Sequence, residues 1–305
     1  MKAARTEQRN PRSRGLDRKS TLEILRALNR EDARVALAVR RELPKIARAV
    51  DAIVKALGAG GRLFYIGAGT SGRLAVLDAA ECPPTFGTPP HMVQAIIAGG
   101  ARALRHASEG AEDSAAAGAR DLRRARLASK DVVVGLAASG TTPYVLGALA
   151  FAKRCGAVTI GVTANPRSPV ARAARIAIAP DTGPEAISGS TRLKAGTAQK
   201  LVLNLLSTAA MVRLGRVYEN WMVHVALTNQ KLRRRGVRIL EEAAGVDAST
   251  AEHAVRQGGN DLAAALVMLK AHVSAPEAKK LLTATGGNVR KALEGAKGRR
   301  RPRRE

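Results

Sequence analysis

The sequence is poor in cysteine and in aromatic residues. Its 305 residues include two cysteines, Cys82 and Cys155, which lie far apart and form no Cys-x-x-Cys pair. This pattern excludes a disulfide framework and a cysteine-based zinc site. Aromatic residues make up 2% of the chain, which leaves few rings on which nucleic-acid bases could stack.

Long hydrophobic runs and an apolar N-terminal segment are also missing. The longest apolar stretches, residues 144–152 and 201–212, are shorter than the roughly 20 residues of a membrane helix or contain polar breaks. The N-terminus is polar and basic, unlike a signal peptide. With a hydrophobic content of 46%, we expect a cytoplasmic protein with a sizeable core and no membrane association.

Acidic residues are outnumbered two to one, with 25 Asp and Glu against 51 Lys and Arg. Residues 297–304 hold six cations, residues 1–45 hold thirteen against six acids, and the other cations are scattered. We interpret residues 297–305 as an unstructured basic tail and expect no specific nucleic-acid partner.

The middle of the chain alternates strand-like runs with helical stretches, which predicts an α/β fold with a doubly wound parallel sheet. Right-handed crossovers would place every strand-to-helix turn at one edge of that sheet. The strand-like runs are residues 63–66, 92–97, 131–136, 157–162 and 176–179.

Helical patterns flank this middle region. Residues 1–19 are predicted to lack regular structure, and Ser20 with Glu23 has the spacing of a capping box that begins amphipathic helices. After residue 236 the strand signals end, and Gly-Gly-Asn occurs twice, within two helix–turn–helix units of roughly 27 residues. The predicted domains are 1–57, 58–225, 236–296 and the basic tail.

Three hydroxyl-rich loops lie at the ends of predicted strands or the starts of predicted helices. Helix N-termini offer free amides and positive charge to anions, and short hydroxyl side chains add donors. Each loop by itself could merely cap its helix, but three on one sheet edge favour an anion site. The candidate substrate-binding residues are Thr70, Ser71, Ser139, Thr141, Thr142, Ser188, Ser190, Thr191 and Lys194.

The anion is expected to be a small phosphorylated molecule. The segment Gly67–Gly72 matches G-x-G-x-x-G, but the next predicted strand ends without the acidic residue that would hold a ribose. The chain contains no G-x-x-x-x-G-K-[ST] motif, and its five histidines lack the spacing of metal ligands.

Five segments of the chain, in order, closely resemble the N-acetylmuramic acid 6-phosphate etherase family. The most specific of them contain Glu-Cys-Pro-Pro-Thr-Phe-Gly and Gly-Ser-Thr-Arg-Leu-Lys-Ala-Gly-Thr, and the resemblance extends over residues from about 6 to 295. The segments are Thr6–Pro11, Tyr65–Leu74, Asp78–Gly87, Glu109–Ser114 and Gly183–Lys200.

This resemblance implies a sugar isomerase (SIS) domain with an N-terminal helical segment and a C-terminal helical domain similar to ubiquitin-associated folds. It implies a cytoplasmic homodimer that binds phosphosugars and needs neither a metal nor an organic cofactor. The implied reaction cleaves the D-lactyl ether of N-acetylmuramic acid 6-phosphate to N-acetylglucosamine 6-phosphate and D-lactate, in cell-wall sugar recycling.

Two residues match the family's catalytic glutamates, Glu81 and Glu112. Opening of the sugar ring makes the C2 proton acidic, so a base can remove it while an acid protonates the leaving lactyl oxygen; water then adds back. Carboxylates can exchange these protons if burial raises their pKa. We assign Glu81 to the lactyl oxygen and water, and Glu112 to the C2 proton or ring opening. Pro83 and Pro84 are expected to end the helix after Glu81.

The chain departs from the family pattern at Thr141, where an Arg is usual, and at His224, where an acidic residue is expected. Two alternatives remain: a phosphosugar isomerase, which would use the same C2 chemistry, and a phosphosugar-sensing regulator. A DNA-binding regulator would need a helix-turn-helix, and residues 20–57 indicate long amphipathic helices broken near Pro44 instead.

Overall fold

A computed structural model of the chain describes residues 5–300, which form two compact units. The first unit comprises the residues up to Ala80 together with Pro90–Thr208, and the second comprises Glu81–Pro89 together with the residues from Ala209 onward. Two of these boundaries fall inside helices, α4 (Gly69–Phe86) and α8 (Lys194–Arg213). This division follows packing contacts and differs from the domain limits predicted from the sequence, which stay a prediction.

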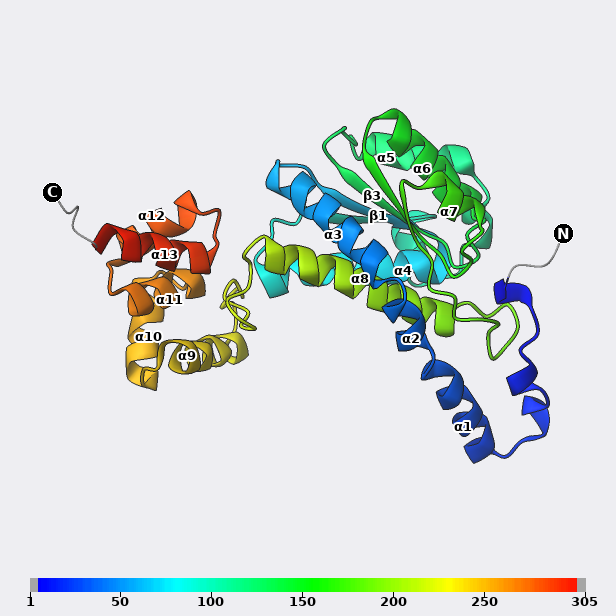
Figure 1. The fold of residues 1–305 in the computed structure, drawn as a ribbon, viewed down its shortest axis with the longest axis horizontal. Helices are drawn as coiled ribbons and strands as arrows, with labels where there is room; N and C mark the ends of the chain where they lie inside the picture. Colours follow the sequence, from blue (N-terminus) through cyan, green and yellow to red (C-terminus); the bar gives the residue numbers. More distant parts are fainter. Residues whose placement is uncertain (1–4, 301–305) are drawn as a thin grey trace. The chain divides into compact units, whose positions relative to one another are not determined.

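A parallel sheet of five strands forms the centre of the first unit (Figure 1). The central strands β1 and β3 are buried along their whole length, as expected for a sheet covered on both faces. The predicted doubly wound sheet is confirmed, and each strand limit lies within one residue of the prediction. The order across the sheet is β2 (Val93–Ile97), β1 (Leu63–Gly67), β3 (Val132–Leu136), β4 (Val158–Val162) and β5 (Ile176–Ile178).

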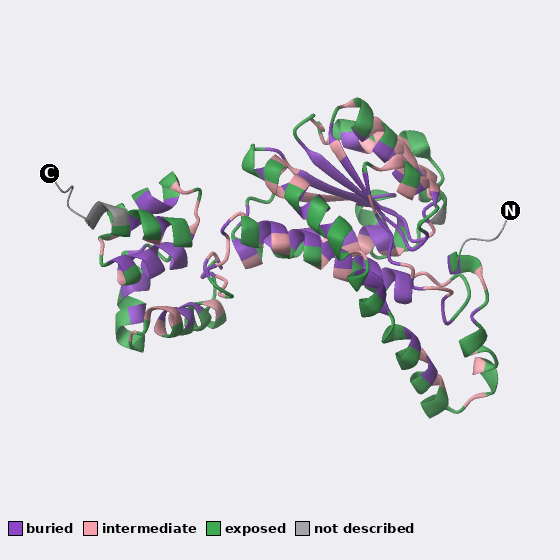
Figure 2. Ribbon diagram, viewed as in Figure 1, coloured by how far each residue is buried: buried purple, intermediate pink, exposed green. Residues whose placement is uncertain are grey.

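Helices cover both faces of this sheet, and its central strands are buried between them (Figure 2). On one face Phe64, Ile66 and Val133 pack with side chains of α5, α6 and α7. Successive strand residues point to opposite faces, so Tyr65 turns to the other side, where its hydroxyl helps to oppose the raised pKa of Asp78 on α4. The further helices are α3 (Leu43–Gly58), which contacts β1, β3 and β5, α5 (Ala115–Arg124), α6 (Pro143–Arg154) and α7 (Pro169–Ala173).

The segment before the first α-helix has regular structure, contrary to the prediction for residues 1–19. Its described part, residues 5–19, forms three short 3-10 helices, Arg5–Glu7, Pro11–Ser13 and Leu16–Arg18. Thr6 and Asn10 are buried. The prediction failed because local polarity does not reveal tertiary hydrogen bonds, which hold this segment; residues 1–4 lie outside the described part.

The predicted capping box is confirmed. The Ser20 side chain accepts from the Glu23 amide, and the Glu23 carboxylate accepts from the Ser20 amide at 2.9 Å, at the start of α1 (Thr21–Asp32). Then follow α2 (Val35–Arg40) and α3, which has Pro44 in its first turn, where no intrahelical amide bond is lost.

The prediction that Pro83 and Pro84 end the helix after Glu81 is wrong, because α4 continues to Phe86. The prolines remove two amide donors, but only one further turn remains. The amide of Gly87 still bonds the Pro83 carbonyl at 2.9 Å, and the buried Phe86 anchors this turn. Gly87 then stops the helix with a positive φ of 60°.

The second unit is helical and contains both predicted helix–turn–helix units. Its core forms around α11, which is buried over residues 262–268 (Figure 2). The basic tail is in part helical, because α13 reaches Arg300, and residues 301–305 lie outside the described part. The helices are α9 (Gln230–Ala244), α10 (Ala248–Gln257), α11 (Leu262–Ala271), α12 (Ala275–Ala284) and α13 (Val289–Arg300).

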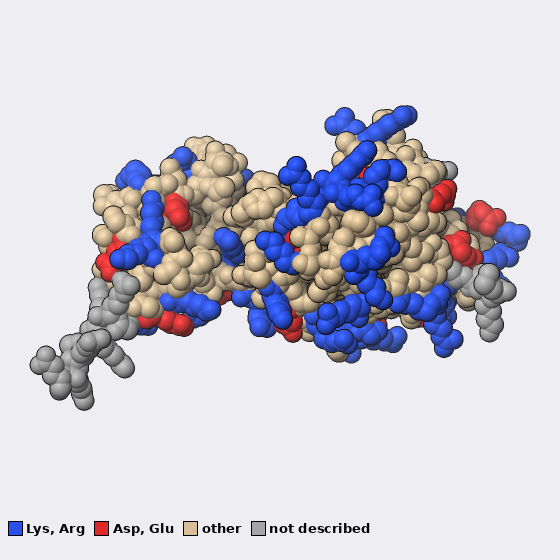
Figure 3. All heavy atoms as spheres, turned by 90° about the horizontal axis from the view of Figure 1, so that it is seen from above, with Lys and Arg blue, Asp and Glu red and all other residues tan. Residues whose placement is uncertain are grey.

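On the face drawn in Figure 3, Lys and Arg side chains outnumber acidic ones and lie dispersed among neutral surface. This dispersal agrees with the scattered cations of the sequence. Within the described residues, every helix is too short or too polar to cross a lipid bilayer.

Candidate functional site

A cavity of about 410 Å³ opens at the edge where the carboxyl ends of the strands meet. Its walls include residues 68–71, after β1, and residues 136–139 and 141–143, from the last residue of β3 onward. Strand order reverses here, because β1 pairs with β2 on one side and with β3 on the other. Ligands of open α/β sheets bind in the crevice at such a reversal.

Two helices begin at the cavity wall. In α4 the first amide bond runs from Gly72 to the carbonyl of Ala68 at 3.1 Å, so the amides of residues 69–71 precede the helical ladder. In α6 the first turn begins at Pro143, directly after Thr142. Gly140 lets the second loop pass close to Ser168, because a Cβ at this position would lie 2.2 Å from Ser168 Oγ. These amides suit an anion.

The start of α4 is fixed against α8. Ser71 Oγ donates to Gln199 Oε1 at 2.8 Å in a buried contact, and Asp78 accepts from Asn204 at 2.7 Å and from Ser207 at 3.2 Å. Burial raises the pKa of Asp78, and these hydrogen bonds oppose that rise. The side chain of Ser71 therefore holds two helices together while its residue lines the cavity.

The third predicted loop reaches the cavity through Gly189 and Thr191. Ser188 and Ser190 are not among the residues that line the cavity in the described chain, and Ser188 Oγ donates instead to the carbonyl of Glu7 at 3.2 Å. The Lys194 side chain is wholly buried. The role of Lys194 as a substrate ligand stays a prediction, and its burial does not favour that role.

The start of α8 is capped by a carboxylate rather than left open. Both Glu185 oxygens accept amide protons, from Lys194 at 3.1 Å and from Ala195 at 2.9 Å, and Glu185 is buried. Burial raises the pKa of Glu185, and the two amide bonds oppose that rise. The start of α8 is therefore covered by Glu185, whereas the starts of α4 and α6 line the cavity, and their role in binding an anion stays a prediction.

Of the two predicted catalytic glutamates, Glu112 lines the cavity together with Asp113. Glu81 belongs to the second unit, in α4. Both glutamates are exposed in the single chain. A third carboxylate, Glu7, also lines the cavity. Sequence reasoning missed it because residues 1–19 were expected to be unstructured, although Glu7 lies in the Thr6–Pro11 segment of the family resemblance.

His224 contacts the second unit's own turns. Its Nε2 lies 2.9 Å from the carbonyl oxygen of Gly287, and a Cβ on Gly87 would lie 2.7 Å from the His224 carbonyl oxygen. Burial lowers the pKa of His224. No cluster of three or more His, Cys, Asp or Glu side chains that could hold a metal occurs among the described residues.

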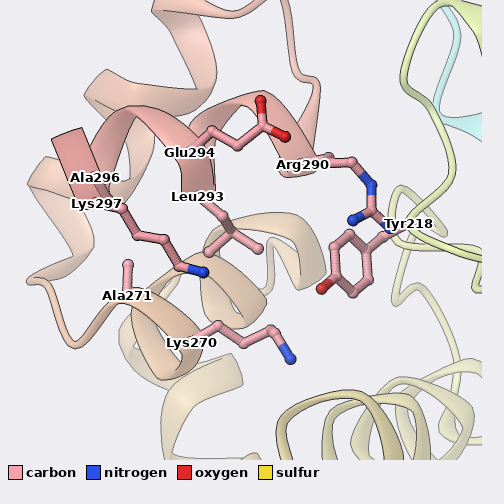
Figure 4. A pocket seen from close by; sticks show the side chains of 8 residues that line it. All are labelled: Tyr218, Lys270, Ala271, Arg290, Leu293, Glu294, Ala296 and Lys297. Atoms are coloured by element: carbon pink, nitrogen blue, oxygen red, sulfur yellow. The ribbon is translucent and has the colours of Figure 1, made fainter.

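A second cavity, of about 300 Å³, lies within the second unit (Figure 4). The Arg290 guanidinium lies 5.0 Å from the centre of the Tyr218 ring, and the Lys270 ammonium lies 5.7 Å from it. Leu293, Glu294 and Lys297 complete much of the wall. The lining contains none of the predicted site residues.

Two curated bacterial proteins are similar to this chain over nearly its whole length. The N-acetylmuramic acid 6-phosphate etherase of Serratia proteamaculans (strain 568) is 55% identical over 288 residues, which cover 94% of this chain and 97% of that protein. The protein of the same name from Yersinia pestis (strain Pestoides F) is 55% identical over 94% of this chain and 98% of its own length.

The likeness extends to a domain family and to a solved structure. The family model of the glucokinase regulatory protein N-terminal SIS domain matches residues 45–153. A crystal structure of a candidate phosphosugar isomerase involved in capsule formation, from Bacteroides fragilis NCTC 9343, superposes with a TM-score of 0.50 at 20% identity. The superposed region covers 66% of this chain and 95% of the Bacteroides fragilis chain. At this identity the likeness concerns the fold alone.

Proposed function

Because this chain belongs to the N-acetylmuramic acid 6-phosphate etherase family, we propose that it cleaves the D-lactyl ether of N-acetylmuramic acid 6-phosphate. The products are N-acetylglucosamine 6-phosphate and D-lactate, and the step belongs to cell-wall amino-sugar recycling. The observation that carries this proposal is the 55% identity, over 94% of the chain, to etherases of that name.

The cavity supports a phosphorylated sugar as the ligand. The amides at the start of α4 and the hydroxyls of Thr70, Ser139, Thr141 and Thr142 surround one volume, and the first residue of α6 also lines it. Such neutral donors, aided by two helix dipoles, suit a phosphate group. We propose that Thr191 also binds the phosphate and that Ser71 does so through its backbone amide. Ser188, Ser190 and Lys194 are proposed to hold in place the loop that carries Thr191.

The reaction proceeds by elimination and then hydration. The ring opens to an aldehyde at C1, and a base takes the C2 proton, so that the electrons of this C–H bond form the C2–C3 double bond. The C3–O bond breaks, and an acid protonates the lactyl oxygen, which leaves as D-lactate. Water then adds at C3 and a proton returns to C2, so the net change is hydrolysis and needs no oxidant or reductant.

Glu81 and Glu112 are proposed to move these protons. Glu81 protonates the lactyl oxygen and later activates water, on the strength of the Glu-Cys-Pro-Pro segment that it shares with the family. Glu112 takes the C2 proton or assists ring opening, and its place on the cavity wall supports this role. Since both are exposed in the single chain, water has to be excluded from them when the sugar binds. The proposed working form is a homodimer in the cytoplasm.

The test measures D-lactate release from N-acetylmuramic acid 6-phosphate by the wild type and by Glu81→Gln. Loss of a general acid–base group should lower kcat by at least about 100-fold, while the amide keeps the shape of the side chain and hence substrate affinity. Equal losses of affinity and turnover would make Glu81 a structural residue. A wild type that binds the sugar phosphate without releasing lactate would instead support the isomerase or the regulator.

A further inference from the structure

A buried carboxylate outside the proposed site joins distant parts of the first unit. Glu31 lies on α1 and is 3% exposed. Its Oε1 accepts from Arg12 Nε at 2.5 Å, and its Oε2 accepts from Asn10 Nδ2 at 2.7 Å and from Lys194 Nζ at 2.5 Å. Donors from the N-terminal segment and from the start of α8 thus converge on one side chain.

Lys194 carries this network into the loop of residues 182–191, which precedes α8. Its ammonium donates to the carbonyl oxygens of Thr182 at 2.9 Å and Pro184 at 2.7 Å, besides its bond to Glu31. These three bonds use its three N–H donors. The Lys194 ammonium is wholly buried, and all its donors are used, so it links the loop to Glu31. Exposing it to a ligand would break the hydrogen bonds that compensate for its burial.

The N-terminal segment returns along the same loop. Ser13 Oγ donates to the carbonyl of Ala186 at 2.7 Å, and the Gly189 amide donates to the carbonyl of Thr6 at 3.1 Å. A Cβ on Gly189 would lie 3.2 Å from Glu7 Oε2. Glu7, Gly189 and Thr191 in turn line the cavity. One buried carboxylate therefore connects, through hydrogen bonds and close contacts, to a wall of the proposed phosphosugar site.

We propose that Glu31 is a positioning residue for phosphosugar binding: through Lys194 and Asn10 it holds the loop of residues 182–191, and with it Glu7 and Thr191, at the cavity. For its substrate this inference rests on the proposed function. Without the Glu31 carboxylate, Lys194 is left as an uncompensated buried charge, which is strongly unfavourable. The loop of residues 182–191 should then shift. Glu112, which is proposed to transfer a proton, lies on a different segment and should stay in place.

The first test is the steady-state kinetics of Glu31→Gln. KM should rise about tenfold or more while kcat changes less than about threefold, because the displaced loop would lose contacts that hold the sugar equally in the ground state and the transition state. Asp131→Asn is the matched control. Asp131 is buried and paired with Arg62 at 2.8 Å, just before β3 and so at the opposite edge of the sheet. It should lower stability and leave KM unchanged.

A double variant separates positioning from stability. Glu31→Gln with Lys194→Met removes both buried charges, and replacing a buried ion pair by apolar groups often restores stability. It also removes the ties to Thr182 and Pro184, so KM should stay high. Recovery of KM together with stability would overturn the inference. So would a normal KM in Glu31→Gln beside a raised KM in Lys194→Met, which would make Lys194 a direct ligand.

Affinity for N-acetylglucosamine 6-phosphate, measured by titration calorimetry on the same proteins, distinguishes this inference from the proposed function. If the wild type releases no lactate but binds this sugar phosphate, the proposed function fails. An affinity about tenfold lower in Glu31→Gln than in Asp131→Asn would then still support positioning. Equal affinities in the two variants would overturn it, whatever the reaction.

Discussion

At the residue scale, the site depends on which hydrogen-bond partner each hydroxyl group has. Ser71 and Ser188 bond other parts of the protein, to Gln199 and to the Glu7 carbonyl. In the second loop, by contrast, Ser139 Oγ and Thr141 Oγ1 lie 2.9 Å apart, and Ser139 Oγ also accepts from the Thr141 amide at 3.3 Å, so these hydroxyls bond within their own loop. This pair is exposed enough to meet a ligand, and Thr141 occupies the position where the family resemblance leads one to expect Arg.

Thr141→Val therefore tests the second loop directly. The substitution keeps the branched shape and removes one hydroxyl, so KM for N-acetylmuramic acid 6-phosphate should rise about fivefold, which corresponds to a net hydrogen bond of about 1 kcal/mol. Stability should change little, because Thr141 is exposed. The kinetics of lactate release check the first expectation and urea unfolding the second. An unchanged KM would place Thr141 outside the substrate contacts.

At the scale of elements, three helices begin beside the loops, and they differ in what covers their first amides. The first turns of α4 and α6 belong to the cavity wall. The first turn of α8 is covered by Glu185, whose carboxylate contributes the negative charge that a helix N-terminus favours. The sequence shows where these helices start but not which of them a distant side chain will cap.

Glu185→Gln should weaken this cap. The amide keeps one acceptor oxygen and loses the negative charge, so the free energy of unfolding should fall by about 1–2 kcal/mol, the usual loss for a helix cap. Urea unfolding of the variant beside the wild type measures this. Ser274, an exposed cap of α12 in the second unit, provides a comparison through Ser274→Ala, where about 1 kcal/mol is expected. A fully stable Glu185→Gln would show that the α8 cap contributes little.

At the scale of the whole molecule, Glu31 links stability to pH. Burial by itself would raise the pKa of Glu31, but hydrogen bonds from Arg12, Lys194 and Asn10 outweigh it and lower the pKa to about 2, from 4.5 in the absence of the fold. A carboxyl group with a lowered pKa stabilises the fold above its unfolded value, and this contribution is lost as pH falls toward the folded value.

The stability difference between the wild type and Glu31→Gln should accordingly be greatest above pH 5. It should shrink as the pH is lowered from about 4.5 toward 2. Urea midpoints of both proteins at several pH values measure the effect. A difference that stays constant over this interval would show that Glu31 is not held ionised by its three donors.

Deletion of residues 297–305 should leave lactate release unchanged. Within this segment the structure describes the side chain of Lys297, which lines the separate cavity of Figure 4 and not the cavity of the first unit. A large loss of activity in the truncated protein would make the basic tail part of the site.

The sequence by itself determined the elements and the family. Apolar periodicity is a local signal, so it located all five strands, the Ser20 capping box and the two helix–turn–helix units. The motifs around Glu81 and Glu112 determined the family for the same reason, since both are contiguous segments. Local signals also misled, at Pro83 and Pro84 within α4, at residues 5–19 and at the start of the basic tail, which α13 includes up to Arg300.

Only the tertiary structure decided which polar groups face the cavity and which support it. Lys194 reads in the sequence like a phosphate ligand, but the fold buries it against Glu31, 163 residues away. Glu7 reads like part of an unstructured tail, but the fold places it on the cavity wall. Hydrogen bonds between segments so far apart depend on how the helices pack around the sheet, and no local pattern of residues records that.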